Sequence, residues 1–230
     1  MSLASKRALD IVVSILALVL LSPIFLLLAL LIKLTSRGPV LFVQTRVGYR
    51  GRLFRFYKFR SMVVNATHGN ATASSAGQIG CGEECPSDGS ERISARIAQI
   101  RQCLDRNPAD QSRFKIEPND PNVTPLGRFI RRTSLDELPQ FYNVLKGEMS
   151  LVGPRPPIPS EARGYLPDAR KRLDVKPGLT CLWQIQGRSL LPFEKRIALD
   201  KEYIRTQSFW RDIVIILRTI PAVIIGRGAY

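Results

Sequence analysis

The sequence predicts a helix-rich α+β fold, and three observations support this class. Residues 11–32 form a 22-residue run without a charged side chain, long enough to cross a hydrocarbon layer as one helix. Residues 53–57 place aromatic side chains around a single arginine, which indicates a β-strand. Residues 129–138 carry apolar side chains that can form one helical face. With 230 residues, 45% of them apolar and 23% charged, the chain is expected to fold as one compact domain or two small ones.

The apolar run near the N-terminus is interrupted at its centre. Both of its flanks are basic, at Lys6-Arg7 and at Lys33, so the positive-inside rule keeps both ends on the cytoplasmic side. Pro23 has no N–H for the carbonyl of Val19, which bends the helix, and the Ser22 hydroxyl can bond a carbonyl of that turn. These features favour a re-entrant hairpin. Proline kinks also occur in spanning helices, so the residues alone leave both interpretations open.

The chain is strongly basic, and its charge is unevenly distributed. A net charge of +15 indicates a polyanionic partner: nucleic acid, an anionic membrane face or a phosphorylated substrate. Residues 1–64 carry +9 and residues 113–230 carry +8, whereas residues 65–112 carry −2. The middle stretch is polar and predicts an insertion between two basic parts. Its cysteines fit a zinc site only loosely, so free thiols are the favoured interpretation of Cys81, Cys85 and Cys103.

A second apolar run, Ile213–Ile225, lies near the C-terminus. It has thirteen residues and is interrupted by Arg218 and Pro221, so it is too short to span a bilayer. With Trp210 and Arg211 just before it, the run fits a helix that lies on lipid headgroups. A plain core helix is an equally good interpretation.

Two adjacent carboxylates, Asp136 and Glu137, are the candidate catalytic residues. In the first interpretation Ser134 and Glu137 form a capping box at the start of a helix. In the second, an Asp carboxylate attacks phosphorus and gives an acyl-phosphate enzyme. That attack requires a divalent metal and Arg or Lys to neutralise the phosphate, and a neighbouring Glu is a suitable oxygen ligand for Mg²⁺. Both interpretations can hold together.

Four basic residues are the candidate ligands for phosphate groups. Lys58 and Arg60 follow the predicted strand, Arg155 lies in the proline-rich turn 153–157, and Arg188 lies in the turn 186–189. The planar fork of arginine can donate two hydrogen bonds to one phosphate. Arg132 has a structural role in this interpretation, although it lies close to the carboxylates in the sequence.

Nucleic acid is the weakest of the three polyanionic partners. The sequence contains no helix-turn-helix pattern, no RNA-binding sheet motif and no aromatic-basic repeats. It also lacks a P-loop, a dinucleotide-binding G-x-G-x-x-G turn and the zinc-protease and hydrolase motifs. A membrane-tethered nucleic-acid-binding protein, or a non-catalytic scaffold, stays as the alternative to an enzyme.

A series of motifs resembles one known family, the bacterial sugar transferases, also called monotopic phosphoglycosyl transferases. The resemblance covers most of the chain, with the motifs in the family's order. They are Lys6-Arg7 with Asp10, Ser22-Pro23, Gly38-Pro39-Val40, Gln44-Thr45-Arg46-Val47-Gly48, Lys58-Phe59-Arg60-Ser61-Met62, Thr133-Ser134-Leu135-Asp136-Glu137-Leu138-Pro139-Gln140, Asn143 through Pro156, Val175-Lys176-Pro177-Gly178-Leu179-Thr180 and Gln186-Gly187-Arg188.

The resemblance implies a specific reaction. The family moves a sugar 1-phosphate from a UDP-sugar to a polyprenyl phosphate such as undecaprenyl phosphate, the first membrane step in making exopolysaccharide, O-antigen or glycoconjugate. It implies Asp136 as the nucleophile, Glu137 as the Mg²⁺ ligand, and a phosphosugar-aspartate intermediate with UMP leaving first. Whether the protein forms a homodimer is left open.

The resemblance also implies an architecture. Residues 1–37 form a re-entrant membrane helix bent at Ser22 and Pro23, and residues 38–230 form a catalytic domain on the cytoplasmic face of the inner membrane. The chain is expected to be a minimal type without the multi-helix N-terminal domain of larger relatives. Two stretches depart from the family pattern: the insertion at 65–112, and Cys181-Leu182-Trp183-Gln184 after the Pro-Gly-Leu-Thr motif.

Overall fold

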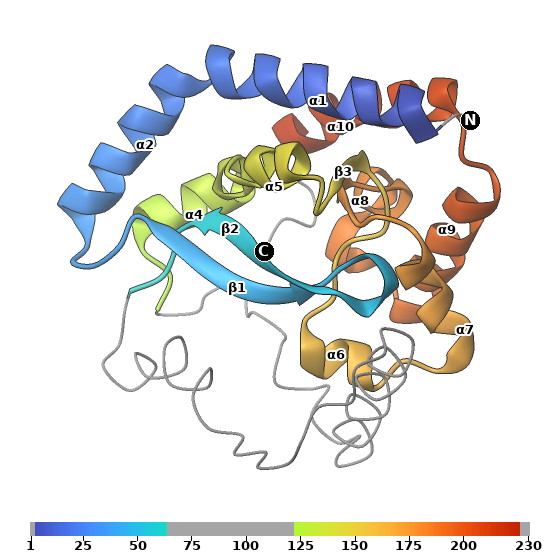
Figure 1. Ribbon diagram of the computed structural model, residues 1–230. Coiled ribbons are helices and arrows are strands. Elements are labelled where there is room, and N and C mark those ends of the chain that lie inside the picture. The colour runs from blue at the N-terminus through green and yellow to red at the C-terminus, as the bar shows by residue number, and fades with distance from the viewer. Residues whose placement is uncertain (1–2, 64–121, 226–230) are drawn as a thin grey trace, which may run out of the picture.

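The computed structural model describes residues 3–63 and 122–225, and within them the chain is helix-rich with two small sheets (Figure 1). The predicted α+β class is confirmed. The predicted insertion at 65–112, with its cysteines, lies outside the described residues. Strands β1 (Leu41–Val47) and β2 (Leu53–Phe59) form an antiparallel hairpin, and β3 (Ser150–Val152) pairs in parallel with β4 (Gly178–Thr180).

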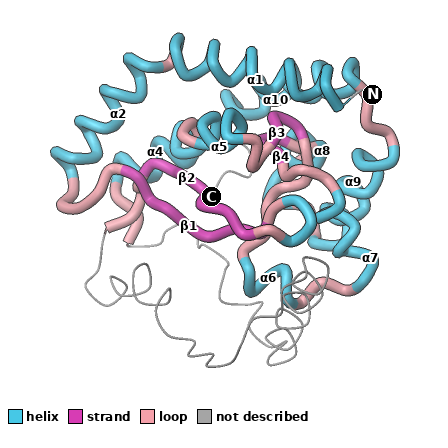
Figure 2. Tube along the Cα trace, in the orientation of Figure 1, coloured by secondary structure: helices cyan, strands magenta, loops and turns pink. Residues whose placement is uncertain are grey.

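The 3-10 turn η1 lies in the loop of the hairpin, and the remaining helices and helical turns follow the hairpin in the chain (Figure 2). In chain order they are η1 (Tyr49–Gly51), α4 (Pro125–Arg132), η3 (Leu135–Glu137), α5 (Gln140–Lys146), α6 (Pro159–Arg163), α7 (Pro167–Arg170), η4 (Lys171–Asp174), α8 (Leu182–Gln186), η5 (Arg188–Leu190), α9 (Phe193–Arg205) and α10 (Phe209–Ile225).

The N-terminal run forms two helices, α1 (Leu3–Leu20) and α2 (Ser22–Thr35), which meet at an angle of 59°. The Ser22 hydroxyl donates to the Val19 carbonyl at 2.8 Å. Pro23 has no N–H to donate to this carbonyl. No single described helix is long and apolar enough to cross a membrane, but this bent pair is, by length and composition. The bend predicted at Ser22-Pro23 is confirmed.

The first turns of α1 are tied to the rest of the fold by polar contacts. Lys6 donates to Asp212 of α10 at 2.5 Å and to the Tyr203 hydroxyl of α9 at 2.8 Å. Arg7 donates to the carbonyls of Val144 and Leu145, the last turn of α5, at 2.6 and 2.7 Å. The buried Asp10 accepts from the Leu151 N–H and the Ser150 hydroxyl of β3. The basic N-terminal flank therefore stabilises the fold, in addition to any contact with lipid.

Beyond these first turns, α1 and α2 expose large apolar side chains. Figure 1 shows the pair as an arch over one side of the molecule, with α5 below α1. Leu28 and Ile32 turn inward and pack with Phe59 and Ile130. The outer face is apolar and solvent-exposed in this structure, at Val12, Ile15, Leu16, Val19, Leu20, Leu26, Leu27, Leu30 and Leu34.

The main core lies between the hairpin, α5, the β3–β4 pair and the C-terminal helices. Phe56 of β2, Met149, Trp183 of α8 and Tyr203 belong to one buried cluster. The fully buried Asn143 of α5 donates to the Arg55 carbonyl at 2.6 Å and accepts from the Tyr57 N–H at 3.3 Å. This contact fixes the position of β2 relative to α5, and the carboxylate turn lies immediately before α5.

The C-terminal helix α10 has one buried face and one exposed face. Asp212 and Ile215 are each 1% exposed, whereas Trp210 is 74% exposed, with Leu217 and Ile220 also exposed. Thr219 bonds the Thr180 hydroxyl of β4 at 2.7 Å. The two interpretations of this run are therefore compatible, because one face packs in the core and the other can meet an interface.

Candidate active site

The carboxylate pair lies on the short 3-10 turn η3, between α4 and α5. Ser134 adopts a left-handed conformation with φ of 55°, and its side chain makes no capping hydrogen bond. The predicted capping box is therefore wrong: the acids lie on a 3-10 turn and not in the first turn of an α-helix. Leu135 and Leu138, on either side of the acids, pack against the cluster around Phe59 and Ile130. This packing holds the turn in place.

Glycine permits α4 to approach the end of β2 closely. A Cβ on Gly127 would lie 1.9 Å from the Ser61 carbonyl oxygen, an impossible contact. Thr124 caps α4 by accepting from the Gly127 N–H at 2.9 Å. The close approach brings the carboxylate turn that follows α4 beside Lys58, near the end of β2.

Two of the predicted cations meet the carboxylates. Lys58 Nζ lies 2.8 Å from Glu137 Oε1 and 3.5 Å from Asp136 Oδ2. Arg155, from the proline-rich turn after β3, places its guanidinium 3.0 Å from the same Glu137 oxygen. The Arg155 side chain is still 30% exposed, so it is accessible to a ligand. Lys58 and Glu137, which are 79 positions apart in the sequence, thus meet in one site.

The two carboxylates differ in their electrostatics. Burial raises the pKa of Asp136, which is 7% exposed, and Lys58 only partly offsets this effect. Burial acts in the same direction on Glu137, but Arg155 and Lys58 together outweigh it and hold the pKa of Glu137 well below its usual range. Glu137 is therefore a permanent anion, and Asp136 is a carboxylate poorly stabilised by its surroundings. A buried, weakly solvated carboxylate is suited to act as a nucleophile.

Arg188 interacts electrostatically with the two carboxylates. It lies in η5 with a positive φ of 51°, and burial lowers the pKa of its guanidinium while Glu137 and Asp136 raise it. No hydrogen bond or ion pair holds its side chain within the described part of the chain. Among the described residues, the Arg188 guanidinium is therefore available to a ligand, and it interacts electrostatically with both carboxylates.

Arg60, by contrast, is directed elsewhere. Its guanidinium donates to the Ser36 carbonyl at 2.8 Å, the Ser36 hydroxyl at 2.7 Å and the Arg37 carbonyl at 3.0 Å. These groups lie at the C-terminal end of α2, where carbonyls lack helical partners. The side chain is only 6% exposed. Arg60 therefore caps the C-terminal end of α2 in this structure, and its assignment to phosphate binding stays a prediction.

Two further arginines contribute to the site, and the sequence interpretation assigned neither to it. Arg131 lowers the pKa of Asp136, and its Nε donates to the Ser61 hydroxyl at 2.8 Å. Its position five residues before Asp136 was a weak signal for proximity. Arg46 of β1 interacts electrostatically with Arg155 and Glu137, and burial followed by Arg155 lowers its pKa to about 10. Only the fold brings Arg46 to this place.

The donor set fits Mg²⁺ held together with a phosphorylated ligand. No cluster of three metal-ligating side chains occurs among the described residues, so the protein offers no complete cage. Mg²⁺ is commonly bound by one or two carboxylates together with substrate phosphates and water. Asp136 and Glu137 supply such carboxylate oxygens, with Glu137 ionised throughout the physiological pH range.

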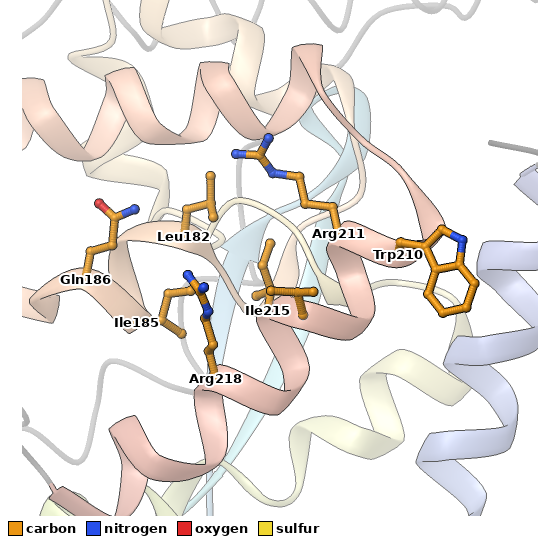
Figure 3. A pocket seen from close by; sticks show the side chains of 8 residues that line it. Leu182, Ile185, Gln186, Trp210, Arg211, Ile215 and Arg218 are labelled. Atoms are coloured by element: carbon orange, nitrogen blue, oxygen red, sulfur yellow. The ribbon is translucent and has the colours of Figure 1, made fainter.

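A separate pocket of about 370 Å³ lies between α8 and α10 (Figure 3). Leu182 and Ile185 of α8 face Ile215 of α10, and Arg211 and Arg218 extend from α10 at its edge. None of the site residues described above lines it. The candidate catalytic side chains on β2, η3 and the proline-rich turn therefore lie outside this pocket.

A buried carboxylate beside a cation-held carboxylate, next to an exposed apolar helix pair, is an arrangement suited to phosphoryl transfer at a lipid surface. The chain belongs to the bacterial sugar transferase family, whose model matches residues 1–226. The family predicted from the motifs is thus confirmed.

Curated relatives align over almost the whole chain. The galactosyl transferase CpsE of Streptococcus agalactiae is 42% identical over 228 residues, covering 99% of this chain and 44% of the relative. The undecaprenyl-phosphate galactose phosphotransferase of Salmonella typhimurium is 39% identical, covering 98% and 41%. The exopolysaccharide production protein ExoY of Sinorhizobium fredii is 36% identical, covering 98% and 88%. The chain thus spans less than half of the first two relatives and most of the third.

Proposed function

We propose that this protein transfers a sugar 1-phosphate from a UDP-sugar to undecaprenyl phosphate, through a covalent intermediate on Asp136. The family and the activity for which the Salmonella relative is named support the reaction class. The observation that carries the assignment to Asp136 is its position: a buried carboxylate of raised pKa, 3.5 Å from Lys58, beside a carboxylate that cations keep ionised.

The first half-reaction exchanges one bond to phosphorus for another. An Asp136 carboxylate oxygen attacks the phosphorus that carries the sugar, and the bond from that phosphorus to the UMP oxygen breaks. UMP leaves with the electron pair. In the second half-reaction, a phosphate oxygen of the polyprenyl carrier attacks the same phosphorus, and the Asp136 carboxylate leaves in its original form. Neither step needs a redox partner.

The cations of the site bind and orient the anionic donor. Arg155 and Arg188 present guanidinium donors near the carboxylates, and Lys58 can turn from Glu137 toward a phosphate. Glu137, with Asp136, would hold Mg²⁺, which supplies charge neutralisation for the pyrophosphate when bound. Positive charge close to the phosphorus reduces the repulsion between the attacking carboxylate and the phosphate oxygens.

We also place the site at the inner leaflet of the cytoplasmic membrane, with α1 and α2 as a re-entrant hairpin. Support comes from the 59° bend, the apolar outer face of both helices and the basic residues at both ends. The exposed face of α10, led by Trp210, would lie at the headgroups. An acceptor with a long isoprenoid chain can then present its phosphate to the site from the membrane.

A UMP-release assay tests this function. Purified protein is given Mg²⁺, undecaprenyl phosphate and each of a panel of UDP-sugars, and UMP is quantified. We expect release with at least one donor, and a loss of about 10³-fold or more for Asp136→Asn, because the amide is not a nucleophile. The matched control is Asp168→Asn, which changes an exposed carboxylate and should leave the rate unchanged. Full turnover by Asp136→Asn would contradict the assignment.

A further inference from the structure

The turn that carries Arg155 is held from both sides by backbone hydrogen bonds. On one side the Gly153 N–H donates to the Thr180 carbonyl at 3.0 Å, and the Gly178 N–H donates to the Pro154 carbonyl at 2.9 Å. A Cβ on Gly153 would lie 2.4 Å from the Lys176 carbonyl, so the turn packs directly on the chain leading into β4. This side fixes the residues before Arg155.

On the other side, the end of β1 fixes the residues after Arg155. The Val47 N–H donates to the Pro157 carbonyl at 3.0 Å, and the Arg46 guanidinium donates to the Pro156 carbonyl at 3.1 Å. Two consecutive prolyl carbonyls are therefore bound by two consecutive residues of β1. Proline restricts φ, so the turn between these anchors has few conformations to lose.

The Arg46 side chain is itself tightly constrained. Its Nε and Nη2 both donate to Gln44 Oε1, at 3.0 and 2.7 Å. Its guanidinium lies 5.3 Å from the centre of the Phe56 ring, and Lys58 Nζ lies 5.5 Å from the same ring. Phe56 is only 1% exposed, so the ring is a rigid support. Arg46 is thereby fixed on the hairpin face that also carries Lys58.

We propose that Gln44 and Arg46 form a positioning pair, the Arg46 clamp, which fixes the proline-rich turn so that Arg155 is directed onto Glu137. Arg46 acts through Arg155 and makes no contact with substrate. The proposal rests on the proposed function for its catalytic consequence, but the placement of Arg155 is a property of the folded protein. The three Arg46 hydrogen bonds given above account for its Nε and both terminal nitrogens.

Chemical labelling of arginine tests the placement without any enzymatic assay. The full-length protein is treated with phenylglyoxal, and labelling of Arg155 is followed by mass spectrometry of peptides, relative to the exposed Arg128. An arginine paired with a carboxylate is held in its charged form and reacts slowly. We expect Gln44→Leu and Arg46→Met to raise the relative labelling rate of Arg155 severalfold. Gln44→Leu leaves every charge of the site in place, so it isolates positioning from electrostatics.

Arg55→Met is the matched control, because it removes the same charge from an exposed position on the same hairpin. It should leave the labelling of Arg155 unchanged. Circular dichroism checks that each variant is folded. If Arg46→Met is unfolded, the labelling of Gln44→Leu alone decides the proposal. An unchanged labelling rate of Arg155 in folded Gln44→Leu would overturn the clamp.

A double-mutant cycle on UMP release tests the catalytic consequence. Arg46→Met alone should lower kcat/KM by about 10- to 100-fold, because small displacements of a positioned group are costly. In the Arg155→Met background, Arg46→Met should lower kcat/KM by less than about threefold, because its effect passes through Arg155. A loss of kcat/KM in the double variant equal to the product of the two single losses would overturn the proposal. If the wild type releases no UMP, the proposed function fails, and the labelling result still decides the clamp.

Discussion

At Asp136, burial and a neighbouring cation act in opposite directions on the same carboxyl group. Burial raises its pKa above the ordinary 3.8, and Lys58 is the first of the charges that lower it. Only the ionised form can attack phosphorus. The reactivity of the site therefore depends on Lys58 as well as on the carboxylate itself.

This balance predicts the pH dependence of the first half-reaction. The rate should fall as the pH drops through the raised pKa of Asp136, because protonation removes the nucleophile. Lys58→Met removes a charge that lowers this pKa, so the acid limb should move to higher pH by about one pH unit or more. Single-turnover UMP release measured across pH checks this. Lys171→Met changes an exposed lysine and is the control. If the acid limb of the pH–rate profile stays in place or moves to lower pH in Lys58→Met, Lys58 does not control the ionisation of Asp136.

Arg60 shows how a residue of the right type can serve a different purpose. We expect Arg60→Met to destabilise the fold by about 2 kcal/mol, because carbonyls at the end of α2 lose charged donors. The KM for the UDP-sugar should not change, whereas Arg155→Met should raise it. Denaturant unfolding and steady-state kinetics on both variants check this pair. A rise in KM for Arg60→Met equal to that of Arg155→Met would restore Arg60 to the binding site.

Among the elements, α1 has two distinct halves. Its first turns dock on α5, β3 and α10 through buried polar contacts, and its second half exposes apolar side chains. The helix is therefore anchored to the catalytic domain at one end and available to lipid at the other. If α1 and α2 enter a membrane as the proposed re-entrant pair, these contacts set the distance between the site and that membrane.

The docked end should contribute strongly to stability. Asp212→Ala leaves the amine of Lys6, which also bonds Tyr203 and the Val152 carbonyl, without its charged partner. Breaking such a buried pair costs about 3–5 kcal/mol. Asp168→Ala breaks an exposed pair with Lys201 and should cost about 0–1 kcal/mol. Urea unfolding of both variants compares them, and equal costs would show that the Lys6 contact does not anchor α1.

The bend between α1 and α2 predicts the topology of the hairpin. Pro23→Ala restores an N–H for the Val19 carbonyl, so the pair should straighten toward a spanning helix. A cysteine substituted at Ala8, in a variant free of other cysteines, reports the side of the membrane. It should react from the cytoplasmic side with Pro23 present and partly from the opposite side in Pro23→Ala. Reaction from the opposite side with Pro23 intact would exclude a re-entrant hairpin.

For the whole molecule, the sequence predicted those features that depend on local chemistry. A proline without an N–H bends a helix wherever it stands, so the angle at Ser22-Pro23 could be foreseen. Lys58 and Arg155 were chosen because one follows a predicted strand and the other lies in a rigid proline-rich turn, and the structure brings both to Glu137. The exposed and buried faces of α10 were each expected, although the sequence could not tell that both occur together.

Features that depend on distant partners could not be predicted. The left-handed turn at Ser134 replaces a capping box because Leu135 and Leu138 must reach a core made by other elements. Arg60 caps a helix that ends more than 20 positions earlier, and Arg46 bonds a carbonyl 110 positions later. Such pairings come from the tertiary fold, and no spacing in the sequence encodes them.

Mass spectrometry of the protein incubated with its UDP-sugar and Mg²⁺ in the absence of acceptor is the sharpest test of a covalent route through Asp136. We expect a sugar-phosphate adduct on the peptide that contains Asp136, and its disappearance when undecaprenyl phosphate is added. An unmodified peptide from a preparation that turns over rapidly with both substrates would contradict a covalent route through Asp136.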